Sequence, residues 1–152
     1  MLFRSVVPER GSDDVQPPIA DIELEIGLVA RSSAVMSEEP DDGVLHLHPS
    51  AASGRPGTRA PHVVLGDGRS TLDLVGPRFA VLRPAGDGAD DWAPAGATSH
   101  IVDAEPFAGQ YGLSPGGAAL VRPDGVVAWR SRGPAGRDEV ARALATAVGS
   151  AG

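Results

Sequence analysis

The sequence predicts a mixed α/β domain, and three stretches of its second half carry that prediction. Two apolar, β-prone runs, Ala118–Arg122 and Val126–Arg130, flank a Pro-Asp-Gly turn and therefore predict an antiparallel hairpin. Residues 137–148 follow with acidic residues in the first turn, apolar residues at four-residue spacing and a glycine stop, which predicts a closing helix. Phe79–Arg83 is the best candidate for a central strand and ends at a proline.

Shorter patterns fill the rest of the sheet. His62–Leu65 and Thr71–Leu74 are divided by Gly-Asp-Gly and predict a short hairpin. His100–Ala104 is expected to be a strand parallel to the central one, and Pro106–Tyr111 a short helix or turn. A mixed sheet with flanking helices is the expected result.

An additional β-hairpin is expected in front of this sheet, over residues 21–48. From Asp21 to Leu28 apolar residues alternate with polar ones, which is typical of a strand with one buried face. Residues 37–43 form a polar turn, and Val44–His48 supplies a second alternating run. Residues 1–18 are interpreted as a flexible leader or docking arm, and residues 19–150 as one domain that contains the hairpin.

Composition excludes several kinds of chemistry. The 152 residues contain no cysteine and no lysine, which removes disulfides, thiolate nucleophiles, zinc–thiolate sites and Schiff bases. A net charge of −7 argues against nucleic-acid partners. No run of about 20 apolar residues suggests a membrane span, so a cytoplasmic location is predicted.

Four segments of the sequence resemble segments of one protein family, in the same order along the chain. They are GRPGTRAPHVVL at residues 54–65, DGRSTLDLVG at 67–76, FAVLRP at 79–84 and the block from 113 to 130. These segments resemble the C-terminal region of FAD-dependent aromatic polyketide hydroxylases of the p-hydroxybenzoate hydroxylase class, such as the tetracenomycin, rifampicin and angucycline monooxygenases. The resemblance covers roughly residues 21–148, with a shortened segment at 85–99. It implies a thioredoxin-like domain without redox cysteines, and a link to oxidoreductases of antibiotic biosynthesis.

The flavin-binding signature of that family does not occur in this sequence. A GxGxxG turn between a strand and a helix, which would cradle the pyrophosphate of FAD, is missing. No cofactor is therefore expected in this chain, and FAD would be supplied only by a partner flavoprotein.

Arg59 and His62 are the leading candidates for a ligand site. Proline and glycine fix the backbone around them, so Arg59 could hold a phenolate, a carboxylate or a flavin phosphate, and His62 is the candidate catalytic base. Alternatively, Arg59 pairs with Asp73 or a backbone carbonyl, and His62 only caps a strand.

Three aromatic residues, Trp92, Tyr111 and Trp129, could stack on a planar ligand such as an aromatic polyketide, or could simply pack in the core. The acidic residues near Trp92, which are Asp87, Asp90 and Asp91, are interpreted as a solvated loop.

His46 and His48 form a weak candidate metal site, because their H-x-H spacing on a strand points both side chains to one face. Oxygen ligands could come from Glu38, Glu39, Asp41 and Asp42. A half-solvated strand explains the same residues without a metal, so none is predicted.

Three functions remain open at the level of sequence. The first is a noncatalytic accessory module that docks on a flavin monooxygenase or self-associates. The second is a cofactor-independent enzyme or binding protein that acts on an aromatic polyketide with a histidine base, by cyclisation, ring opening or isomerisation. The third is an inactive remnant of a longer hydroxylase.

Overall fold

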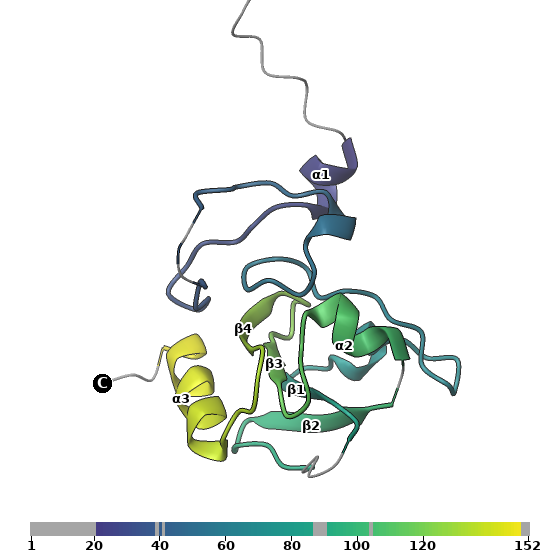
Figure 1. Ribbon diagram of the computed structural model, residues 1–152. Helices are drawn as coiled ribbons and strands as arrows, with labels where there is room; N and C mark the ends of the chain where they lie inside the picture. The colour runs from purple at the N-terminus through teal and green to yellow at the C-terminus, as the bar shows by residue number, and fades with distance from the viewer. Residues whose placement is uncertain (1–20, 39, 41, 87–90, 104, 150–152) are drawn as a thin grey trace, which may run out of the picture.

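Figure 1 shows the computed structural model, in which a four-stranded mixed sheet lies between two helices. The structure describes residues 21–149 apart from 39, 41, 87–90 and 104. The strand order is β2-β1-β3-β4; β1 pairs parallel with β2 and antiparallel with β3, and β3 pairs antiparallel with β4. The strands are β1 (Phe79–Pro84), β2 (Ala97–Val102), β3 (Ala118–Val121) and β4 (Val127–Ser131).

The central strand β1 is buried on both faces, as a strand in the middle of a covered sheet must be. Ala80 and Leu82 pack on one face beneath α2 (Glu105–Tyr111), together with Phe107 of that helix. Val81 points to the other face, beneath α3 (Arg137–Ala147). The prediction of a central strand at Phe79–Arg83 is confirmed.

The hairpin and the closing helix of the second half are also confirmed. The amide N–H of Arg122 donates to the carbonyl of Val126 at 2.8 Å, and Gly125 completes the turn with φ of +81°. A bulge between Leu120 and Val121 shifts the register along β4. β3 therefore ends one residue before the predicted run does, and β4 begins and ends one residue later than predicted. The closing helix α3 follows in the predicted place.

The predicted parallel strand and short helix are present as β2 and α2. β2 begins at Ala97, three residues before the predicted start, because all six residues of β1 find a partner in it, from Phe79 opposite Ala97 to Pro84 opposite Val102. The longest described helix, α3, has 11 residues, and none of the helices described is long and apolar enough to cross a bilayer.

The prediction of an additional N-terminal β-hairpin is wrong for its first strand, since Asp21–Ile26 forms the helix α1. Only the end of the predicted pair exists, as an isolated antiparallel bridge between Leu28 and His46. If the two segments stayed paired in the register of this bridge, Glu25 would lie opposite Pro49. Pro49 lacks an N–H to donate and begins the 3₁₀ helix η1 (Pro49–Ala51). Without a partner strand, this segment, which carries two glutamates and one leucine between Asp21 and Ile26, forms a helix that ends before Gly27.

The predicted hairpin at His62–Leu65 and Thr71–Leu74 is wrong in its second half. Val64 and Ser70 form one antiparallel bridge, but Thr71–Leu74 is a 3₁₀ helix, η2. The Ser70 hydroxyl accepts from the amide of Leu72, and the Asp73 carboxylate accepts from the amide of Ser70. This capping box starts a helical turn where alternation suggested a strand.

The boundaries of the leader at 1–18 and of the domain at 19–150 stay predictions.

Candidate functional site

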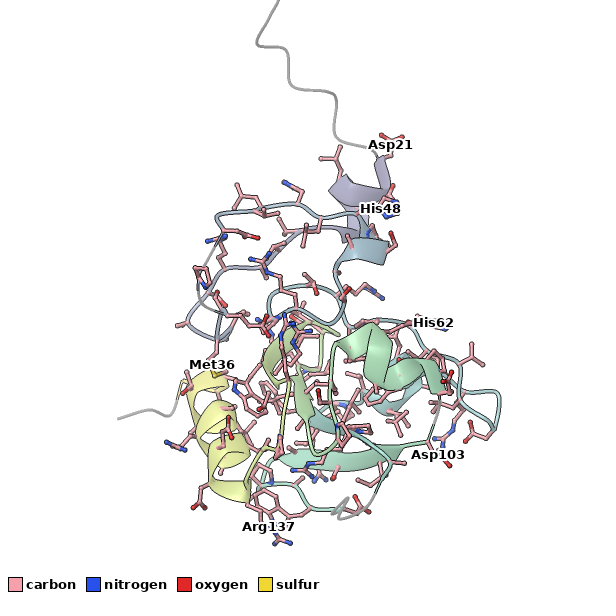
Figure 2. The ribbon with its side chains drawn as sticks, viewed as in Figure 1. Asp21, Met36, His48, His62, Asp103 and Arg137 are labelled. Atoms are coloured by element: carbon pink, nitrogen blue, oxygen red, sulfur yellow. The ribbon has the colours of Figure 1, made fainter. Side chains whose placement is uncertain are left out.

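A pocket of about 160 Å³ lies between the N-terminal segment and residues 58–62. Figure 2 labels His48 beneath α1 and His62 near α2, on the two sides of this region. Arg59 and His62 both line the pocket, so the structure brings the two leading candidates together. The apolar side chains of the wall are Ile26, Leu47, Pro49, Ala52, Ala60, Pro61 and Leu72.

The backbone that carries Arg59 is fixed along the outer side of β4. Gly57 donates to the carbonyl of Val127 at 2.8 Å, and Val127 donates back to Thr58 at 2.9 Å. Arg59 itself forms an antiparallel bridge with Val126. This pairing holds the pocket wall in place without any ligand.

The guanidinium of Arg59 is exposed and has no side-chain partner among the residues described. The alternative pairing with Asp73 is not formed, because that carboxylate caps η2. His62 is also exposed and lies at the mouth of the same pocket. Both side chains are therefore accessible to an incoming molecule.

The polar groups inside the pocket are already satisfied. The Thr58 hydroxyl donates to the carbonyl of Arg55 at 2.7 Å. The carbonyl of Pro61 accepts from the hydroxyls of Tyr111, at 2.9 Å, and Thr71, at 2.7 Å. A ligand inside this pocket would meet an apolar surface, and would find charge only at the rim.

The three aromatic candidates are not brought together. Tyr111 is fully buried, and its ring lies tilted against that of Phe107 with 4.6 Å between the ring centroids. Burial raises the pKa of Tyr111 to about 12. Trp92 and Trp129 pack beneath α3, on the opposite face of the sheet. The guanidinium of Arg137 covers Trp92, with 4.9 Å from its carbon to the ring centroid. All three therefore pack in the protein.

His46 and His48 do not form a metal cluster with the acidic residues described. Nδ1 of His48 pairs with the Ser50 hydroxyl at 2.7 Å and caps η1. Within the described part of the chain no three potential ligands gather at one point. Glu38 and Asp42 are engaged in ion pairs with arginines, and the other two predicted oxygen ligands, Glu39 and Asp41, lie outside the described residues.

A partly buried ion pair that the sequence did not reveal ties the N-terminal segment to β4. Arg130, 2% exposed, donates through Nε and Nη2 to both oxygens of Glu38, each at 2.7 Å. Its Nη1 also donates to the carbonyls of Ser53 and Tyr111. Burial of Glu38 opposes its ionisation, but the hydrogen bonds from Arg130 and Arg132 outweigh burial and lower its pKa to about 2. These partners lie 92 residues apart, and no local pattern identifies them.

A second, more polar cavity of about 340 Å³ opens beside this ion pair, and a third of about 430 Å³ lies at the edge strand β2. The third contains His100, whose pKa is lowered by burial and by Arg69, against the opposing effect of Asp91. The other two residues of the predicted acidic loop, Asp87 and Asp90, lie outside the described residues.

The sequence and the fold together identify the class of protein. The profile of the family "Aromatic-ring hydroxylase, C-terminal" matches residues 53–151, and the chain belongs to this family. The 4-methyl-5-nitrocatechol 5-monooxygenase of Burkholderia sp is 40% identical over 154 residues, which cover 86% of this chain and 28% of that protein. Aklavinone 12-hydroxylase RdmE of Streptomyces purpurascens is 37% identical, over 70% of this chain and 23% of its own length.

Solved structures agree with that assignment. Aklavinone-11 hydroxylase, crystallised with FAD and aklavinone, superposes with a TM-score of 0.73 and 31% identity. The match covers 86% of this chain and 28% of the hydroxylase. The substrate-free rebeccamycin biosynthetic enzyme REBC gives a TM-score of 0.61 with 31% identity, over 86% of this chain and 24% of that enzyme. The chain thus spans about a quarter of the proteins it matches.

Proposed function

We propose that this chain is a noncatalytic module of an aromatic-ring hydroxylase and works by docking on a separate flavin-binding chain. The observation that carries the proposal is the family match, which identifies residues 53–151 as the C-terminal domain of an aromatic-ring hydroxylase. The solved relative holds FAD, whereas the present sequence lacks the glycine-rich turn that would cradle the pyrophosphate of a flavin. The oxidation itself would then take place on the partner.

The architecture supports a thioredoxin-like origin for this module. The order β2-β1-β3-β4, the parallel β1–β2 pair and the closing helix α3 agree with the thioredoxin-like interpretation. The chain has no cysteine, so thiol exchange is not its chemistry. A scaffold of this kind without its redox residues fits a role in binding.

Exposed apolar side chains support docking through the N-terminal part. Six large apolar side chains are exposed among the described residues, and four of them fall between residues 24 and 45: Leu24, Ile26, Leu28 and Leu45, each 40–56% exposed. Apolar groups concentrated in one part of a surface favour contact with another protein. The same part carries α1, which contacts η1.

The proposal can be tested with the Burkholderia monooxygenase as the partner. Its flavin-binding part, prepared without the C-terminal quarter and shown to retain FAD, is mixed with this chain and separated by size. We expect flavin absorbance to elute with the chain, and oxidation of 4-methyl-5-nitrocatechol to increase when the chain is added. Flavin-loaded partner that elutes alone, with unchanged activity, would contradict the proposal.

A matched pair of variants locates the docking surface. We expect the double change Leu24→Ser and Leu28→Ser to weaken the complex, because both side chains are more than half exposed and lie in the N-terminal part. Val148→Ser, which changes a 51% exposed residue after α3, serves as the control and should leave binding intact. An equal loss of binding in the double variant and in the control would show that the N-terminal part is not the surface that contacts the partner.

A second candidate function is favoured by the pocket that unites Arg59 and His62. In this alternative the chain converts an aromatic compound without a cofactor, with His62 as the general base. Consumption of aklavinone by the purified chain, lost in His62→Gln, would support it, and an unchanged compound would eliminate it. The small volume of the pocket makes a polyketide of several rings a poor fit, so docking is the stronger proposal.

A further inference from the structure

The pocket at Arg59 combines features that a docking module does not require. Its wall is aliphatic, its interior polar groups already have partners, and none of the described residues that line it is acidic. Its charged group is the Arg59 guanidinium, which no described side chain neutralises. An apolar interior with a cation at the rim is the complement of a ligand with an apolar body and an anionic end.

The volume limits the size of that ligand. An apolar cavity of about 150 Å³ in another protein accommodates a benzene ring. The present pocket, at about 160 Å³, therefore takes one six-membered ring. Three or four fused rings exceed this space.

The pocket is also preformed. The backbone of Gly57 and Thr58 is held by hydrogen bonds to β4, and Ala60 donates to the carbonyl of Gly125 at 2.8 Å. On the other side, Leu47 donates to the carbonyl of Gly27 at 2.8 Å, which fixes the N-terminal wall. Because both walls are set before binding, little ordering of the chain opposes the ligand.

We propose that this pocket binds a small aromatic anion, with one ring among the aliphatic side chains and the anionic oxygen paired with the guanidinium of Arg59. His62 lines the same pocket, and in this proposal its ring gives a second hydrogen bond to that oxygen. A carboxylate and a phenolate share the required chemistry. The pocket shares Ile26 with the exposed apolar side chains of the N-terminal part. Binding of the anion needs no partner protein, so it is expected in the chain alone.

The test is a titration of the full isotope-labelled chain with benzoate, followed by amide chemical shifts. We expect saturable shifts at residues of the pocket, with a dissociation constant in the millimolar range, on the order of what a ligand of few atoms can achieve. Acetate has the charge without the ring and benzyl alcohol the ring without the charge, and each should bind at least about tenfold more weakly. 2-Anthracenecarboxylate should not enter, because its three rings exceed the volume.

Two arginine variants identify the charged partner. Arg59→Gln should weaken benzoate binding about tenfold, and Arg59→Lys should recover part of the loss. Arg78→Gln, at an exposed arginine outside the pocket, is the matched control and should bind as the natural chain does. The amide spectrum of each variant reports whether it is folded; if Arg59→Gln is not, the comparison of the four probes on the natural chain decides alone.

The inference is overturned if benzoate gives no saturable shifts, or if acetate, benzyl alcohol or 2-anthracenecarboxylate binds as tightly as benzoate. It is also overturned if folded Arg59→Gln binds benzoate as the natural chain does, or if Arg78→Gln weakens binding as much as Arg59→Gln. Since no flavoprotein is present in these measurements, a failure here leaves the docking proposal standing. Failure of docking likewise leaves this site intact.

Discussion

Replacing Glu38 with glutamine should destabilise the protein in a way that depends on pH. The change keeps the shape of the side chain but removes the charge that Arg130 meets at 2.7 Å through two nitrogens. A carboxyl pKa lowered from its ordinary 4.5 to about 2 corresponds to roughly 3 kcal/mol of favourable interaction. Because Glu38 is 29% exposed, solvent screening reduces this, and we expect a loss of about 2 kcal/mol.

The sign of the pH dependence follows from the direction of the pKa shift. Since the pKa of Glu38 is lower in the folded protein, its contribution is complete above about pH 4.5 and is lost as the pH falls towards 2. The free energies of unfolding of the natural chain and Glu38→Gln should therefore differ at pH 7 and converge in acid. At pH 7 the melting temperature should fall by about 4–8 °C.

Urea unfolding followed by circular dichroism at pH 7 and pH 3 measures both effects. The control is Asp42→Asn, which removes an equally short bidentate pair with Arg55. Asp42 is 51% exposed, so its pair is screened by water and the variant should unfold almost as the natural chain does. The reasoning is refuted if Glu38→Gln has the stability of the natural chain at pH 7, or if Asp42→Asn is as damaging.

Three further expectations concern the residues around the pocket. Gly57→Ala should lower the free energy of unfolding by more than about 2 kcal/mol, since φ is +90° and the new Cβ would lie 2.5 Å from the carbonyl oxygen of Ala30. Gly125→Ala, with φ of +81° and open space around the new Cβ, should cost only about 1 kcal/mol in the same urea unfolding assay. Equal losses in the two variants would contradict the predicted clash. Tyr111→Phe should cost about 1 kcal/mol by urea unfolding, because the carbonyl of Pro61 keeps its bond from Thr71, and a loss above about 3 kcal/mol would mean that the hydroxyl has another role. Tyr111 is the sole tyrosine, so the phenolate absorbance of the folded chain should appear near its pKa of about 12. The free energy of unfolding should decline as the pH rises from 10 to 12. A titration midpoint near 10, in protein that still has its native circular dichroism, would show that the ring is not buried.

Local signals in the sequence were enough for the second half of the fold. The Pro-Asp-Gly turn, the apolar run at Phe79 and the closing helix with its acidic first turn each depend on a few neighbouring residues, and the structure contains all three. The block around Arg59 and His62 likewise led to the pocket, because proline and glycine restrict its backbone locally. The family resemblance, which rests on the same segments, is confirmed by the match over residues 53–151.

Only the tertiary structure decided features that depend on a distant partner. Alternation at Asp21–Leu28 suits a strand, but a strand needs a neighbour, and Pro49 and η1 occupy the place where that neighbour would continue. The aromatic candidates were divided by the sheet, with Tyr111 on one face and Trp92 and Trp129 on the other. Glu38 and Arg130 meet across 92 residues, since long-range pairs are set by how the chain packs and leave no mark in the local pattern.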